Sequence, residues 1–180
     1  LHLVKRNLFH NMFQSGTSSK IVVPNAVYVD PTYNCNRKCR GCYVEKNGKV
    51  MPYELAEEVC FSASNIGVNY IAWLGGEPLH PTVRGMVLGL IAKFPKMSFM
   101  FCTNGDFLDK NVAGKLAETN NAIALISVDG LADTNDWRRG NGAYRGAMNA
   151  MDQLRGKGLL FGYMSTVMPT NYLEVSSQEF

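Results

Sequence analysis

The 180-residue sequence has no long hydrophobic run, no marked excess of one charge and only three histidines. No stretch of about 18 apolar residues occurs, which argues against a transmembrane helix. The 18 basic and 15 acidic residues leave a net charge of +3, too small to predict a nucleic-acid or membrane-surface partner. With 46% hydrophobic and 18% charged residues, the composition is instead that of a globular domain with a substantial core.

The five cysteines cannot all pair with one another, because their number is odd. Cys35, Cys39 and Cys42 fall within eight positions, which favours a metal site over a disulfide framework. Free thiols are typical of a reducing compartment, so we predict a cytoplasmic protein. Cys60 lies in a helical pattern and Cys102 ends an apolar strand, and we expect both to be buried small hydrophobic residues.

Short apolar runs alternate with helical patterns along the chain. We expect strands at 26–30, 70–74, 98–102, 122–128 and 159–168, and helices at 52–66, 82–94, 109–119, 143–155 and from 171 onward. This order is typical of βα units on a parallel sheet, in a barrel or a doubly wound fold. Five strands would leave a barrel open, and the chain begins with Leu1, so we expect a piece of a longer protein.

Distinctive loops follow the first four expected strands. The cysteine cluster follows the first strand, residues 75–78 the second, 103–105 the third and 127–130 the fourth. The carboxyl ends of parallel strands share one edge of a sheet, where α/β folds place their active sites. The sequence therefore predicts a single site that gathers all four loops.

The number of clustered cysteines bears on the metal that they bind. Thiolates bind both iron–sulfur clusters and zinc. Three thiolates leave one iron of a four-iron cluster open, whereas a structural zinc ion needs a fourth ligand, for which His80 is a candidate. We favour the cluster and keep zinc as the alternative. Arg37, Lys38 and Arg40 lie between the cysteines, where they either stabilise an anionic cluster or form a solvated loop surface.

The spacing Cys35-x3-Cys39-x2-Cys42 resembles the cluster motif of the radical SAM superfamily, and the resemblance runs from about residue 22 to the end. It implies a partial (β/α)6 TIM-like barrel with the first five βα units present. Residues 1–20 would then be an N-terminal extension and 21–180 a radical SAM core domain truncated at its C-terminal end. In this family the cysteines hold a [4Fe–4S] cluster whose open iron binds S-adenosylmethionine (SAM). Reductive cleavage of SAM yields a 5′-deoxyadenosyl radical that abstracts a hydrogen atom from substrate.

The resemblance also implies a set of SAM-binding residues on the loops after the second to fourth strands, closest to the molybdenum-cofactor and sulfatase-maturase subgroup. The set is Gly75, Gly76, Glu77, Pro78, Thr103, Asn104, Ser127, Asp129 and Arg139. Glycines let backbone approach a ligand closely, and the carboxylate of Glu77 suits the SAM ammonium. Arg139, or its neighbour Arg138, matches an arginine that pairs with the SAM carboxylate.

Two positions concern the adenine of SAM. Gly41 stands where many family members have an aromatic residue, so Tyr43 becomes the candidate to stack on adenine. Val167 and Met168 are expected at the end of the fifth strand, where an apolar residue often packs on adenine. We predict no general acid or base beyond the cluster site.

The leading functional hypothesis is a radical SAM enzyme that modifies a peptide or protein. A glycyl-radical-enzyme activating enzyme is the alternative within the family. From another class, the candidates are an iron–sulfur electron-transfer module and a zinc-stabilised binding domain. The resemblance also implies a one-electron donor such as flavodoxin or ferredoxin.

Overall fold

The computed structural model describes residues 23–180, so the predicted N-terminal extension at 1–20 lies outside the described residues. Five strands form one parallel sheet in the order β1-β2-β3-β4-β5. They are β1 (Val27–Val29), β2 (Tyr70–Trp73), β3 (Ser98–Thr103), β4 (Ala122–Ser127) and β5 (Phe161–Met164). Each strand pairs with the next one along the chain, as in a barrel wall, which confirms the predicted fold class.

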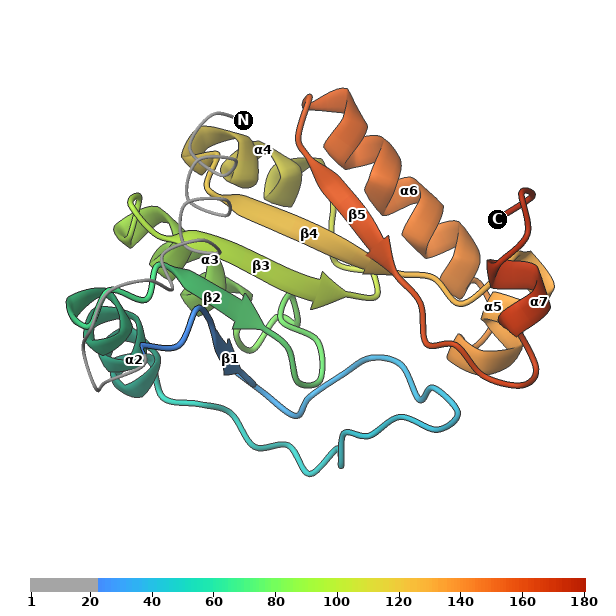
Figure 1. Ribbon diagram of the computed structural model, residues 1–180, viewed down its shortest axis with the longest axis horizontal. Coiled ribbons are helices and arrows are strands. Elements are labelled where there is room, and N and C mark those ends of the chain that lie inside the picture. The colour runs from blue at the N-terminus through green and yellow to red at the C-terminus, as the bar shows by residue number, and fades with distance from the viewer. Residues whose placement is uncertain (1–22) are drawn as a thin grey trace.

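At least one helix follows each strand along the chain (Figure 1). They are α2 (Tyr53–Asn65), α3 (Arg84–Lys93), α4 (Lys110–Thr119), α5 (Ala132–Arg139), α6 (Ala143–Gly156) and α7 (Tyr172–Val175). Contacts run from α2 to α3, from α3 to α4 and from α4 to α6, so these four helices form a continuous layer over the sheet. Within residues 23–180, no helix has the length and apolar character needed to cross a membrane.

The core lies between the sheet and this helical layer, because strand residues alternate between the two faces of the sheet. In β3, Phe99 and Phe101 are buried in the core cluster. Met100 and Cys102, on the opposite face, are only half-buried and line a cavity. Trp73 is also fully buried, and its ring is parallel to that of Phe99 with centroids 6.3 Å apart. One face of the sheet therefore builds the core and leaves the other for a site.

The structure corrects three details of the predicted elements. β5 ends at Met164 and not at 168, because the hydroxyl of Ser165 and the amide of Thr166 bond to the segment after β4. α5 has no counterpart among the predicted helices, because its segment ADTNDWRR contains a single large apolar residue and no apolar period. The helix predicted from 171 onward is the short α7.

We expect Phe101→Ala to destabilise the fold by about 3–5 kcal/mol, because the fully buried ring would leave a cavity beneath the helices. Met100→Ala on the same strand is the matched control and should cost much less, because Met100 lines the open cavity. Urea unfolding followed by circular dichroism measures both losses. Equal losses would contradict the placement of the core on the helical face.

Candidate functional site

A cavity of about 1080 Å³ is lined by residues from the carboxyl ends of all five strands. The predicted site residues that line it are Cys35, Cys39, Cys42, Tyr43, Gly75, Gly76, Glu77, Asn104, Ser127, Arg138 and Arg139. Pro78, Thr103 and Asp129 are buried and do not line it. The structure thus brings the four predicted loops together, with three of the predicted residues behind the cavity wall.

The three clustered cysteines lie on the loop between β1 and α2, with free thiols. The amide of Cys42 donates to the carbonyl of Cys39 at 3.3 Å, which forms a turn between the second and third cysteines. Burial raises the pKa of the Cys35 thiol, so this thiol needs a cationic or metal partner to ionise readily. Thiolates that line one cavity fit the donor set of an iron–sulfur cluster.

The zinc alternative needs a fourth ligand. His80 does not line the cavity, and its Nδ1 lies 2.9 Å from the hydroxyl of Thr82. The ring of His80 also packs edge-on against Phe107, with centroids 5.6 Å apart. Among residues 23–180, no three His, Cys, Asp or Glu side chains are grouped as the ligands of one metal ion.

Gly75 and Gly76 bring the loop after β2 against the cysteine loop. The amide of Gly76 donates to the carbonyl of Thr32 at 2.8 Å, and the amide of Glu77 donates to the carbonyl of Asn34 at 2.9 Å. A Cβ on Gly76 would lie 2.1 Å from the carbonyl oxygen of Asn34, and Gly75 has a φ of +83°. These glycines are therefore required for contact between two loops, a reason that the sequence alone does not reveal.

Glu77 is buried and joins the loop after β2 to the loop after β3. Its Oε1 accepts hydrogen bonds from the hydroxyl of Thr103 at 2.6 Å and the amide of Leu79 at 3.0 Å. Its Oε2 accepts one from the amide of Asn104 at 2.8 Å. Burial raises the pKa of Glu77 to about 7, against the opposing effect of these three hydrogen bonds. Since a carboxylate has about four acceptor positions, the protein itself uses most of this one.

Asp129 holds both candidate arginines in the cavity wall. Its Oδ2 lies 2.6 Å from Nη1 of Arg138 and 2.5 Å from Nε of Arg139, and its Oδ1 accepts from the amide of Thr166 at 2.7 Å. Burial opposes the ionisation of Asp129, but Arg139, Thr166 and Arg138 together outweigh it and lower the pKa of the carboxyl. One buried carboxylate therefore orients two cations that line the cavity.

The residues that line the cavity but are absent from the predicted set include Asp30 after β1, Cys102 on β3 and Met164 at the end of β5. Cys102, predicted to be buried, is half-buried, and its Sγ lies 3.7 Å from Sδ of Met164. Successive residues of a strand face opposite sides of the sheet, so the alternation along β3 could have predicted that Cys102 faces the cavity. Because β5 ends early, Val167 and Met168 lie outside the cavity lining, and Met164 takes the position predicted for them.

Comparison with known proteins gives a family match along most of the chain. The model of the radical SAM superfamily matches residues 29–175. The mycofactocin maturase MftC of Mycolicibacterium smegmatis is 33% identical over 144 residues, which are 76% of this chain and 36% of that protein. The Fe-coproporphyrin III synthase of Methanosarcina barkeri is 29% identical over 151 residues, 80% of this chain and 37% of that protein. The chain spans about a third of the length of such curated relatives.

Solved structures of SuiB from Streptococcus suis share the fold. SuiB bound to S-adenosylmethionine matches with a TM-score of 0.75 at 18% identity, over 84% of this chain and 36% of that chain. SuiB bound to the precursor peptide SuiA matches with a TM-score of 0.71 at 18% identity, over the same shares of the two chains. At this level of identity the likeness establishes the fold alone.

We expect Gly76→Ala to destabilise the protein by about 1–3 kcal/mol, because its Cβ would displace the backbone of the cysteine loop. Gly85→Ala in α3 is the matched control. A Cβ there meets no atom within 4 Å, so the helix should gain up to about 1 kcal/mol. Thermal unfolding measures both changes, and a Gly76→Ala protein as stable as the wild type would contradict the tight loop contact.

The raised pKa of Glu77 predicts a pH dependence of stability. The folded protein binds this proton more tightly than the unfolded chain, so the contribution of Glu77 to the free energy of unfolding is largest in acid. That contribution should fall as the pH rises from 4.5 to about 7. The difference in unfolding free energy between the wild type and Glu77→Gln should therefore decrease, by on the order of 1–3 kcal/mol, in urea titrations across this range. A constant difference would show that burial does not raise the pKa of this carboxyl.

Proposed function

This chain belongs to the radical SAM superfamily, and on that basis we propose that Cys35, Cys39 and Cys42 hold a [4Fe–4S] cluster beside a SAM-binding cavity. The observation that carries the proposal is that the three thiols, the 75–77 loop and two cations line one cavity. When bound, the cluster supplies the electron that cleaves SAM to methionine and a 5′-deoxyadenosyl radical. The named relatives include a maturase and a synthase, so the family is one of enzymes.

Charge complementarity supports an orientation for the methionine part of SAM. We assign its carboxylate to Arg139, because this arginine uses Nε on Asp129 and keeps its two terminal nitrogens for a bidentate partner. Arg138 instead uses its terminal Nη1 on the same carboxylate. The SAM ammonium is assigned to the remaining acceptor position of Glu77 and to the backbone carbonyls of the same loop.

The other residues of the predicted set fall into two groups. Asn104 and Ser127 line the cavity and offer polar contacts, and Tyr43, which is 76% exposed, offers an aromatic face for adenine. Thr103 and Asp129 act as positioning residues, since their side chains bind Glu77 and the arginines. We place Pro78 in the same supporting role, because it is buried directly after Glu77.

We propose a peptide or protein as the substrate, since one relative is a maturase and SuiB has been solved with a precursor peptide. A tetrapyrrole is the second candidate, because a relative of comparable similarity is named as an Fe-coproporphyrin III synthase. The half-buried Met100 and Cys102 and the exposed Met164 give the cavity an apolar, sulfur-rich part that suits either one. We also propose that a flavodoxin or ferredoxin supplies the electron, in the cytoplasm, where the five free thiols would stay reduced.

After anaerobic reconstitution, we expect the protein to hold about four irons per chain and to convert SAM to 5′-deoxyadenosine on reduction with dithionite. Cys35→Ala, Cys39→Ala and Cys42→Ala should each lose most of the iron and at least about 100-fold in 5′-deoxyadenosine formation, because each removes one thiolate ligand. Cys60→Ala is the matched control, since Cys60 is buried in α2 and does not line the cavity.

Iron and sulfide analysis, with chromatography of the SAM products, measures these changes. Zinc in place of iron in the wild-type protein would favour the structural alternative. A cluster that leaves SAM intact would favour the electron-transfer alternative.

A further inference from the structure

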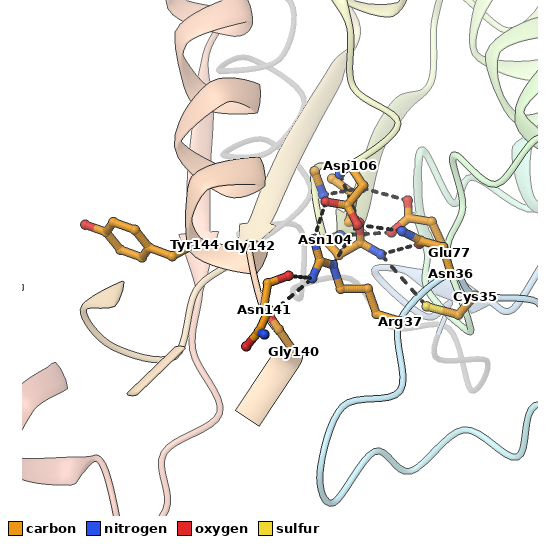
Figure 2. A network of polar contacts seen from close by, with 12 residues as sticks. Cys35, Asn36, Arg37, Glu77, Asn104, Asp106, Gly140, Asn141, Gly142 and Tyr144 are labelled. Atoms are coloured by element: carbon orange, nitrogen blue, oxygen red, sulfur yellow. Dashed lines mark hydrogen bonds and ion pairs between the residues drawn. The ribbon is translucent and has the colours of Figure 1, made fainter. Parts of the chain in front are cut away.

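Arg37, between the first two clustered cysteines, ties the cysteine loop to two other parts of the fold. Its guanidinium pairs with both carboxylate oxygens of Asp106, with Nε–Oδ2 and Nη2–Oδ1 distances of 2.6 Å each. Its Nη1 donates to the carbonyls of Gly140 at 3.3 Å and Asn141 at 3.2 Å, as Figure 2 shows. One side chain thus connects the cysteine loop to the β3–α4 loop and to the α5–α6 turn.

Asp106 is held in place by a second set of contacts. Its amide donates to Oδ1 of Asn104 at 2.9 Å, and its carboxylate also accepts from Nδ2 of Asn36 at 2.5 Å. Nδ2 of Asn104 in turn donates to Oδ1 of Asn36 at 2.9 Å (Figure 2). Adjacent residues of the cysteine loop, Asn36 and Arg37, therefore bind two residues of the loop after β3, one of which also donates its amide to Glu77.

The α5–α6 turn is equally well defined. The carboxylate of Asp136 accepts from the amides of Gly142 at 2.6 Å and Tyr144 at 2.7 Å, which fixes the start of α6. A Cβ on Gly146 in α6 would lie 2.5 Å from Oδ1 of Asp106. The ion pair therefore occupies a space that α6 leaves open by having glycine at this position.

The basic residues of the cysteine loop differ in their surroundings. The side chains of Arg37 and Asp106 are only 13% and 19% exposed, and each neutralises the charge of the other. The guanidinium of Arg40 lies 4.5 Å from the centroid of the Trp137 ring. Lys38 is exposed and makes no hydrogen bond or ion pair with any residue in 23–180. The contacts of Arg37 connect loops that are far apart in the sequence, a role that the sequence alone does not reveal.

We propose that Arg37, paired with Asp106, is a positioning residue that holds the cysteine loop in its cluster-binding conformation before a cluster is present. The loop at 31–50 contains neither helix nor strand. Backbone hydrogen bonds hold parts of it, such as the bridge between Thr32 and Val50 and the bond from the amide of Arg40 to Arg138. The side chain of Arg37 adds contacts between the first two cysteines. If the loop is already ordered when the protein folds, cluster binding does not have to overcome the loss of the loop's conformational entropy. The inference rests on the proposed function, since the three thiols serve a cluster only if that function holds.

The test compares hydrogen–deuterium exchange in cluster-free wild type, Arg37→Ala and Lys38→Ala. In Arg37→Ala we expect loop amides at 31–50 to exchange at least about tenfold faster, while amides of β3 and β4 keep their protection. Lys38→Ala, which removes the same charge from the same loop, should match the wild type. Asp106→Ala should reproduce Arg37→Ala, and the exchanged pair Arg37→Asp with Asp106→Arg should recover part of the protection.

Iron retained after reconstitution should follow the same order, with Arg37→Ala and Asp106→Ala well below Lys38→Ala. If Arg37→Ala loses protection throughout the sheet, the same exchange measurement on Arg37→Gln tests the proposal instead. This variant removes the ion pair but keeps much of the side-chain volume. Unchanged loop exchange in Arg37→Ala or Arg37→Gln would overturn the proposal, and so would equal effects of Arg37→Ala and Lys38→Ala. A wild-type protein that takes up no cluster would overturn the proposed function instead, because the exchange comparison needs no cluster.

Discussion

The arrangement of the site depends on the hydrogen bonds that join each strand-end loop to the next. The loop after β2 donates two backbone amides to the cysteine loop, and glycine at position 76 is what permits that approach. Glu77 then accepts from Thr103 and Asn104 on the loop after β3. The amide of Arg40 donates to the carbonyl of Arg138, which ties the cysteine loop to α5. Since the cysteine loop contains neither helix nor strand, these contacts, together with those of Arg37, hold its thiols at the cavity.

Two buried carboxylates support the site in different ways, because their hydrogen-bond donors differ in charge. Glu77 accepts from one hydroxyl and two amides, which are neutral, and burial raises its pKa to about 7. Asp129 accepts from two guanidinium groups, and its pKa falls below the ordinary value although burial opposes its ionisation. The two arginines thus stabilise the anionic form of Asp129, which orients them, whereas burial raises the pKa of Glu77 toward neutral pH.

Much of the fold and of the cavity lining was predictable from the sequence, because both follow from local patterns. The alternation of strands and helices predicts the parallel sheet, and strand ends followed by Cys, Gly-Gly-Glu, Thr-Asn-Gly and Ser-Val-Asp-Gly predict where the site lies. A motif identifies its residues without showing which way each side chain points. Thr103 and Asp129 are therefore buried outside the cavity lining, where they bind other site residues, while Cys102 and Asp30 line the cavity. The partnership of Arg37 with Asp106, far apart in the chain, needs the tertiary structure.

The central claim is that three thiols hold a four-iron cluster with one iron left for SAM. The most direct test is low-temperature electron paramagnetic resonance of the anaerobically reconstituted, dithionite-reduced protein, recorded with and without SAM. A reduced [4Fe–4S] signal that changes when SAM is added is the predicted result, because SAM would bind at the open iron. A cluster signal indifferent to SAM, or no cluster signal at all, would contradict the claim.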